Sequence, residues 1–140
     1  MIIIDTNVLA ELMKPKPDPH VVAWIAKQLA VELFTTSITE AEVFYGIELL
    51  SKGKRREALL GVAEAMFAED FAGRILGFES DAARAFSRIA AHRRALGRPI
   101  SHADAQIAAI AQARSAKLAT RNLGDFQHCG LDVINPWNGS

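Results

Sequence analysis

The sequence predicts an α/β protein with one three-layer α/β/α domain, in which helices cover both faces of a short, mostly parallel sheet of about five strands. Three observations lead to this prediction. Short apolar runs rich in β-branched residues alternate with segments of helical periodicity. The 140 residues are 50% hydrophobic and 23% charged, which suffices for one buried core without disulfide support. No internal repeat or low-complexity segment interrupts the pattern, so we expect residues 1–140 to form one domain.

Five apolar runs are the expected strands. The first is a run of three isoleucines, Ile2–Ile4, followed directly by Asp5, Thr6 and Asn7. The remaining runs are Leu33–Thr36, Arg74–Phe78, Lys117–Thr120 and Asp132–Ile134. Because helical segments separate most of these runs, we expect neighbouring strands to pair in parallel.

Helical periodicity fills the intervals between the strands. The expected helices are Val8–Met13, His20–Ala30, Thr39–Leu50, a segment around Leu59–Met66, Ser80–Gly97 and Ser101–Arg114. In the second helix we expect Val22, Ile25 and Leu29 to face the core, whereas Val21 and Trp24 lie off that stripe and suggest a second apolar contact. The second and third helices have more apolar residues than one face needs, so they either thicken the core or offer a groove to a partner. The last helix is apolar almost all round, which is typical of a central buried helix.

Charge and cysteine content limit the classes of protein to consider. Sixteen Lys and Arg balance sixteen Asp and Glu, so any contact with nucleic-acid phosphates must be local rather than driven by overall charge. The single Cys129 cannot form an internal disulfide, and no basic segment precedes the N-terminal apolar run as it would in a secretory signal. No stretch is long enough to cross a membrane. We therefore expect a cytoplasmic protein.

Three carboxylates stand at predicted junctions between a strand or loop and a helix. Asp5 follows the first strand, at the edge where open α/β sheets bind ligands. The segments Thr39–Glu42 and Ser101–Asp104 each place a hydroxyl three residues before a carboxylate. Helix capping alone explains all three positions, because Asp5 can cap the first helix, and Glu42 and Asp104 can complete capping boxes.

A shared site is the alternative to capping. An ionised carboxylate in the first turn of a buried helix costs on the order of several kcal/mol, whereas a cap contributes only about one. If the fold brings Asp5, Glu42 and Asp104 together, their repulsion raises their pKa values unless a divalent cation neutralises them. Such an all-oxygen cluster suits Mg²⁺ or Mn²⁺, and no His and Cys spacing suggests zinc.

Six segments, taken in order along the chain, resemble PIN-domain ribonucleases. They are Met1–Asn7, Ser37–Glu42, Ile100–Ile110, Ala119–Asn122, Asp125–Phe126 and Asn135–Trp137. More narrowly, they resemble the VapC toxins of bacterial toxin–antitoxin pairs, including the subgroup whose antitoxins bind DNA. No segment is specific by itself, but the ordered set spans nearly the whole chain.

This resemblance implies a Mg²⁺- or Mn²⁺-dependent endoribonuclease, a hydrolase that cleaves RNA with metal-activated water. It also implies inhibition by a small cognate antitoxin, a homodimer, and a larger assembly on DNA through the antitoxin. By position, Asp5, Glu42 and Asp104 match the family's catalytic metal site, and Thr6 matches the hydroxyl beside it. A catalytically weak or inactive PIN-fold binding module in a nucleic-acid-binding complex remains the alternative.

The chain departs from the family pattern after the fourth strand. Many PIN domains have a fourth acid there, whereas this chain has Asn122, which can offer an amide oxygen but no charge and equally suits a cap for the following turn. Asp125 is a candidate for the missing charge and is equally suited to the surface. We therefore expect one firmly held ion, with a second arriving only with the substrate phosphate.

Basic residues near the expected site are candidates for RNA contacts. Arg121 is the best placed because it follows the fourth strand directly. Two further candidate clusters are Arg93, Arg94 and Arg98, and Lys52, Lys54, Arg55 and Arg56. Each of these groups also fits an ordinary solvated face.

Overall fold

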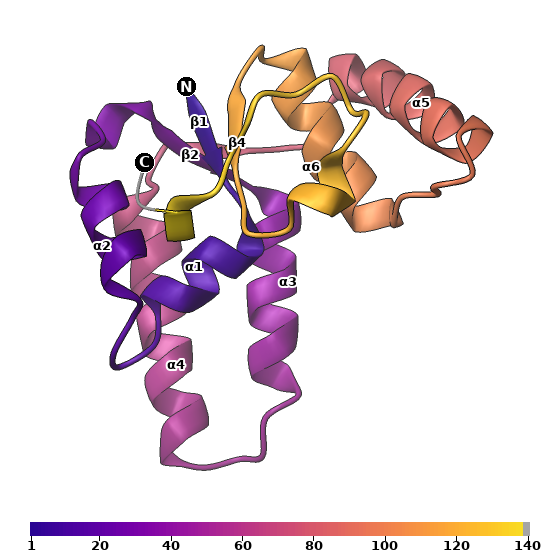
Figure 1. Cartoon of the computed structure of the whole chain (residues 1–140). Helices are drawn as coiled ribbons and strands as arrows, with labels where there is room; N and C mark the ends of the chain where they lie inside the picture. Colours follow the sequence, from indigo (N-terminus) through magenta and orange to yellow (C-terminus); the bar gives the residue numbers. More distant parts are fainter. Residues whose placement is uncertain (139–140) are drawn as a thin grey trace.

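The computed structural model describes residues 1–138 and places a five-stranded sheet between two groups of helices (Figure 1). The strand order is β3-β2-β1-β4-β5, and each neighbouring pair is parallel. The strands are β1 (Ile2–Ile4), β2 (Leu33–Thr36), β3 (Ile75–Leu76), β4 (Lys117–Ala119) and β5 (Val133–Ile134). The predicted α/β/α sheet is confirmed, and β1 is its central strand.

The two faces of the sheet carry different helices. The helices are α1 (Thr6–Leu12), α2 (Pro19–Ala26), α3 (Ser37–Glu48), α4 (Lys54–Ala65), α5 (Ser80–Ala95) and α6 (His102–Ala113). Ile3 packs in a cluster with α5 and α6, whereas Ile4 packs in a second cluster with α1 to α4. This division follows from the alternation of side chains along a strand.

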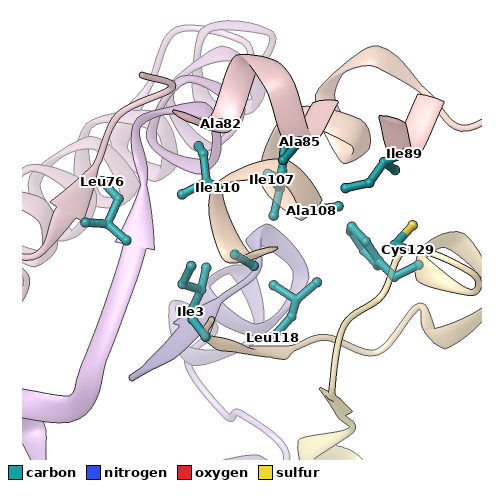
Figure 2. Packing of buried hydrophobic residues seen from close by; sticks show 14 residues of the cluster. Ile3, Leu76, Ala82, Ala85, Ile89, Ile107, Ala108, Ile110, Leu118 and Cys129 are labelled. Carbon is teal, nitrogen blue, oxygen red and sulfur yellow. The ribbon is translucent and has the colours of Figure 1, made fainter. Parts of the chain in front are cut away.

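The core beside α6 is built from small and β-branched residues. Figure 2 shows Ile107 and Ile110 of α6 lying between the sheet residues Ile3 and Leu118 and the alanines of α5. Alanines on both helices let α5 and α6 approach closely, and α6 is buried along Ala105–Ala111. The prediction of a central buried helix is confirmed. Truncating Ile107 to Ala would cost about 2–5 kcal/mol of stability.

The prediction for α2 is wrong in its buried face. Val21 and Trp24 are the buried residues of this helix, whereas Val22 is 40% exposed and Leu29 is 70% exposed. The helix ends at Ala26, four residues earlier than predicted, and packs against the C-terminal turn Pro136–Asn138. Val21 and Trp24 therefore make the second apolar contact that their positions suggested, but the local pattern did not identify the partner because that turn is distant in sequence.

Two helices begin earlier than their sequence patterns suggest. The first begins at Thr6, because Asp5 caps it, and α3 begins at Ser37, because the hydroxyl of Thr36 accepts from the Thr39 backbone N–H at 3.0 Å. Figure 1 shows α3 and α4 extending away from the sheet, with their connection at the remote end. Among the residues described, no helix has both the length and the apolar character needed to cross a bilayer.

Candidate functional site

Asp5 is the innermost acid of the carboxyl edge of the sheet. It directly follows β1, and its backbone N–H donates to the carbonyl of Ala119 in the adjacent strand β4 at 3.0 Å. The residue is only 4% exposed. Its Oδ1 accepts from the Thr6 backbone N–H at 2.8 Å, so Asp5 also caps α1. The capping interpretation of Asp5 is therefore confirmed, and the cap is compatible with the predicted role of Asp5 in a shared site.

The second oxygen of Asp5 is held by two side chains that sequence reasoning did not select. The Thr120 hydroxyl donates to Oδ2 at 2.7 Å, and the Asn7 amide donates to the same oxygen at 3.1 Å. Asn7 also donates to Thr120 at 3.1 Å and accepts from the Arg121 backbone N–H at 3.0 Å. Polar residues directly after two paired apolar strands were the available signal for this network.

Glu42 faces α1 rather than the start of its own helix. The Thr6 hydroxyl donates to Glu42 Oε1 at 2.7 Å and lies 3.1 Å from the hydroxyl of Thr39. Because Thr36 caps α3, Thr39 is an internal helix residue and Glu42 lies in the second turn. The capping-box interpretation of Glu42 is therefore wrong, and its carboxylate is turned toward the neighbour of Asp5.

Asp104 lies in the first turn of α6, as predicted. The Ser101 hydroxyl caps this helix by accepting from the Asp104 backbone N–H at 3.2 Å. Burial raises the pKa of the Asp104 carboxyl, and a hydrogen bond with Ser101 opposes that rise. The negative charges of Asp125 and Glu42 raise this pKa further, while the Arg93 charge lowers it. Asp104 therefore donates its backbone N–H to the cap, and the charges of two other acids raise the pKa of its carboxyl.

Electrostatics connects the three predicted acids. Burial raises the pKa of Asp5 to about 6, against the lowering effect of its hydrogen bonds with Thr120 and Thr6. The charges of Asp104 and Glu42 raise it further. None of the ion pairs within residues 1–138 includes any of these three acids. A buried carboxylate with acidic neighbours and no cationic partner is an environment that favours binding of a divalent cation.

The donor set fits Mg²⁺ or Mn²⁺ by chemistry, but it is not assembled around one point. All candidate donors are carboxylate or hydroxyl oxygens, which are the ligands these ions prefer. In the described part of the chain, no three His, Cys, Asp or Glu side chains are close enough to hold a metal ion as they stand. Shared coordination would therefore require side-chain rotation, which the half-buried Glu42 and Asp104 permit more readily than the hydrogen-bonded Asp5.

The segment after β4 contributes the remaining predicted residues. Asn122 precedes the 3-10 turn Leu123–Phe126, yet its side chain makes no capping bond to that turn. Its backbone N–H donates to Thr120 Oγ1 at 3.2 Å. Asp125 is exposed, but its charge affects Asp104 more strongly than that of Glu42 does. Asn122 carries no charge, so Asp125 is the residue of this segment whose charge acts on Asp104.

The basic candidates differ sharply in accessibility. Arg121 is exposed, and its guanidinium carbon lies 4.9 Å from the centre of the Trp137 ring. Arg94 and Arg98 are exposed as well. Arg93 is only 5% exposed and donates to backbone carbonyls, so the prediction that it contacts RNA is wrong.

An apolar groove of about 650 Å³ opens beside the acids, between α1, α3 and α4. Thr6 and Glu42 lie at its polar border, and its apolar wall includes Met13, Ile47 and Leu59.

The apolar residues of α2 and α3 have different surroundings. Val21 and Trp24 of α2 lie in the core, and Val43 and Ile47 of α3 belong to the same core cluster while also lining this groove. Tyr45 and Leu49, in contrast, are exposed.

Comparisons with known proteins all find similarity to PIN-domain proteins and toxins. The model of the PIN domain matches residues 2–129. The chain is 41% identical over 137 residues to the VapC ribonuclease Y4jK of Sinorhizobium fredii, covering 98% of each chain. It is 37% identical over 138 residues to toxin FitB of Neisseria gonorrhoeae, covering 99% of each.

Solved structures extend this similarity to the whole fold. FitAcB from Neisseria gonorrhoeae matches with a TM-score of 0.91 at 37% identity, over 98% of this chain and 99% of that chain. The structure of FitAB bound to the IR36 DNA fragment gives the same TM-score and identity, over 98% of this chain and 96% of that chain.

Proposed function

This chain belongs to the PIN domain family, with VapC-type toxin ribonucleases among its relatives, and we propose that it is a metal-dependent endoribonuclease that acts as the toxin of a toxin–antitoxin pair. One observation carries the metal dependence. Acids from three distant segments influence one another at the carboxyl edge of the sheet, without a cationic partner among residues 1–138. Carboxylates that side-chain rotation brings to one ion are a common basis for metal-assisted phosphodiester hydrolysis.

Each side chain of the site has a separate task in this proposal. A Mg²⁺ or Mn²⁺ ion bound by Asp5, Glu42 and Asp104 would supply Lewis-acid stabilisation of the scissile phosphate and a more acidic water. Thr120 holds Asp5 in one orientation, and Thr6 does the same for Glu42. No serine nucleophile is needed.

RNA binding completes the proposed catalytic arrangement. Arg121 directly follows Thr120, which donates to Asp5, and presents an exposed guanidinium with the Trp137 ring supporting one of its faces. A guanidinium that is fixed in this way loses less conformational entropy when it binds a phosphate. Because the chain has zero net charge, we propose that such local contacts guide single-stranded RNA to the site.

The decisive experiment compares the wild-type protein with Asp5→Asn on RNA in Mn²⁺ or Mg²⁺, with and without a chelator. Cleavage that requires the metal and is lost in the variant supports the nuclease. RNA binding without cleavage, unchanged by the chelator or the variant, would support the second candidate, a non-catalytic binding module. The observation that favours this second candidate is Asn122, which stands where many PIN domains have a fourth acid.

We also propose that the groove between α1, α3 and α4 receives a segment of the cognate antitoxin. The groove is apolar along most of its wall and ends at Glu42, so an apolar segment with one basic residue would fit both features. The basic group would compete with the metal for the acids. Inhibition in this way requires the purified complex to cleave RNA more slowly than the free toxin at saturating metal, and equal rates would exclude it.

Assembly is the last part of the proposal. We propose a cytoplasmic homodimer that joins a DNA-bound complex through its antitoxin, as one related pair, FitAB, has been solved bound to a DNA fragment. Light scattering of the free toxin should then give twice the chain mass of 15.2 kDa. A monomer at micromolar concentration would contradict the dimer without affecting the nuclease proposal.

A further inference from the structure

The groove between α1, α3 and α4 has a small residue on each of its walls. Ala10 of α1, Gly46 of α3 and Ala58 of α4 line it, and all three are exposed. A Cβ added to Gly46 would meet no atom of residues 1–138 within 4 Å, so internal packing does not require glycine there. Glycine destabilises a helix interior relative to other residues, and its position in this wall leaves room for another backbone to approach α3 closely.

The groove carries opposite charges at its two ends. Glu42 lies at the end beside the acids, and two cations, Lys14 and Arg55, also line the groove. Lys14 Nζ lies 2.9 Å from Glu11 Oε1, so its charge is already paired. Arg55 is exposed in the first turn of α4, at the remote end of the hairpin (Figure 1), and the ion pairs of the described residues do not include it. The available cation is therefore at the end opposite Glu42.

The length of the groove limits what can reach both charges. The lining residues of α3 run from Glu42 to Leu50, which is roughly 12 Å along the helix axis at 1.5 Å per residue. A partner segment covers this length with about eight residues if it is helical and with about four if it is extended. Its two complementary charges are therefore about seven residues apart in a helix and about four apart in an extended segment.

The walls of the groove favour a helical partner over an extended one. All three walls are helices, whose backbone N–H and C=O groups are bonded within each helix. Between its charged ends the wall is apolar. An extended segment would therefore leave its own backbone groups without partners there, whereas a helix satisfies its backbone internally and can bury an apolar side.

We propose that the groove receives an amphipathic helix of the antitoxin, with a basic residue at the Glu42 end and an acidic residue at the Arg55 end, about seven positions apart. The apolar side of this helix packs over Gly46. The inference rests on the proposed role of the groove in antitoxin binding, and it adds the conformation of the partner and a second charged anchor. Arg55 gives selectivity, because a partner with a base at that end meets a like charge.

The first experiment tests the approach over Gly46 with a synthetic peptide of about four helical turns. The peptide has leucines along one side and a lysine and a glutamate about seven residues apart, and both chain orders are measured by fluorescence anisotropy. Gly46→Leu should weaken binding roughly tenfold or more, because its side chain enters the groove. The same change should raise the melting temperature of the free protein by about 2–4 °C, since leucine favours the helix.

Gly61→Leu is the matched control for Gly46→Leu. Gly61 is exposed inside α4, a Cβ there would also meet no described atom within 4 Å, and it does not line the groove. This variant should gain similar stability and bind the peptide like the wild type. A purely structural role for Gly46 would instead give the two variants the same affinity.

The second experiment exchanges the charge at the remote end. The wild type should bind the peptide with glutamate at that end roughly fivefold to tenfold more tightly than the same peptide with lysine there. Arg55→Glu should reverse this preference. Lys54→Glu makes the same change of charge one residue away, outside the groove lining, and should keep the preference. A proline-containing peptide with its charges about four residues apart should bind at least tenfold more weakly than the helical one.

Four results would overturn the proposal. They are absence of peptide binding to the wild type, equal affinities of Gly46→Leu and Gly61→Leu, equal preferences of Arg55→Glu and Lys54→Glu, and tighter binding of the extended peptide. If Gly46→Leu instead converts a dimer to a monomer in light scattering while peptide binding is unchanged, the groove belongs to a second copy of the chain. Peptide binding is measured without RNA or metal, so its failure leaves the nuclease proposal standing, and a protein that cleaves no RNA can still confirm the groove.

Discussion

Asp5 and Asp104 lie at the same edge of the sheet, but their surroundings differ. Asp5 is buried, and both of its oxygens accept hydrogen bonds from Thr6, Asn7 and Thr120. Asp104 is half-buried in a first helical turn, and its acidic neighbour Asp125 is exposed on a turn tied down by Arg93. One half of the site is therefore built into the sheet, and the other half is free to adjust.

This difference indicates how a site with uncompensated acids can remain folded. The hydrogen bonds around Asp5 offset part of the free energy lost by burying its carboxylate. The Asp104 half keeps more contact with water, so the ionised form costs less there. Closure around an ion would then move the Asp104 half toward the Asp5 half rather than the reverse.

The largest effect on activity is expected from Asp5, in the half of the site that is built into the sheet. Asp5→Asn should lower the rate of metal-dependent RNA cleavage by roughly a thousandfold or more, because a lost metal ligand removes several kcal/mol of transition-state stabilisation. Asp104→Asn should act in the same direction with a smaller loss. Single-turnover rates at saturating Mn²⁺ measure both. Asp132→Asn, exposed before β5 at the opposite edge of the sheet, is the control and should retain full activity.

The next effect concerns stability and pH. The folded-state pKa of Asp5 is about 6 against an ordinary value of 3.8, a difference worth on the order of 3 kcal/mol. The folded state therefore binds more protons than the unfolded state between these values, so the free energy of unfolding of the metal-free protein should fall as pH rises through this window and level off above it.

Urea denaturation from pH 4 to pH 8 tests this dependence. The comparison with Asp5→Asn isolates the contribution of Asp5, because other acids such as Glu11 and Asp18 have lowered pKa values and act in the opposite direction. The variant should lose most of the fall in stability and keep only the part due to Asp104, whose pKa burial also raises. Mn²⁺ should restore stability to the wild type above pH 6. Parallel curves for the two proteins would show that burial does not perturb Asp5.

A smaller effect should come from the hydrogen bond that fixes Asp5. Thr120→Val removes the hydroxyl that donates to Oδ2 and should cost about 1–3 kcal/mol of stability. It should also lower activity by roughly tenfold through loss of orientation. Thr35→Val is the matched control, because the Thr35 hydroxyl makes a buried bond to the Ile4 carbonyl and touches no acid. Equal losses of activity in the two variants would contradict the assigned role of Thr120.

The smallest effect is expected outside the acids. Arg121→Gln should raise KM several-fold with little change in kcat, since its guanidinium would contact a phosphate rather than the reacting atoms. The slope of log affinity for single-stranded RNA against log salt should change by about 0.7. Arg88→Gln, on the exposed surface of α5, should change neither. Identical salt slopes for both variants would contradict a contact between Arg121 and an RNA phosphate.

Local patterns in the sequence were enough to predict much of this protein. The alternation of apolar runs with helical periodicity predicted the parallel sheet between helices, and the uniform apolarity of residues 101–114 predicted the buried α6. The position of Asp5 after the central strand and of Asp104 in the first turn of α6 followed from the same periodicities. These features depend on spacings within about a dozen residues, which the chain displays directly.

Only the tertiary structure decided which groups satisfy one another across the chain. It turned Glu42 away from its own helix toward Thr6, brought Thr120 to Asp5, and buried Arg93 against the turn of Asp125. The partners in these three contacts are 36, 115 and 32 residues apart. A hydroxyl, carboxylate or guanidinium has no periodicity that reveals its partner, because its hydrogen bonds depend on where distant segments meet once the apolar faces have been buried.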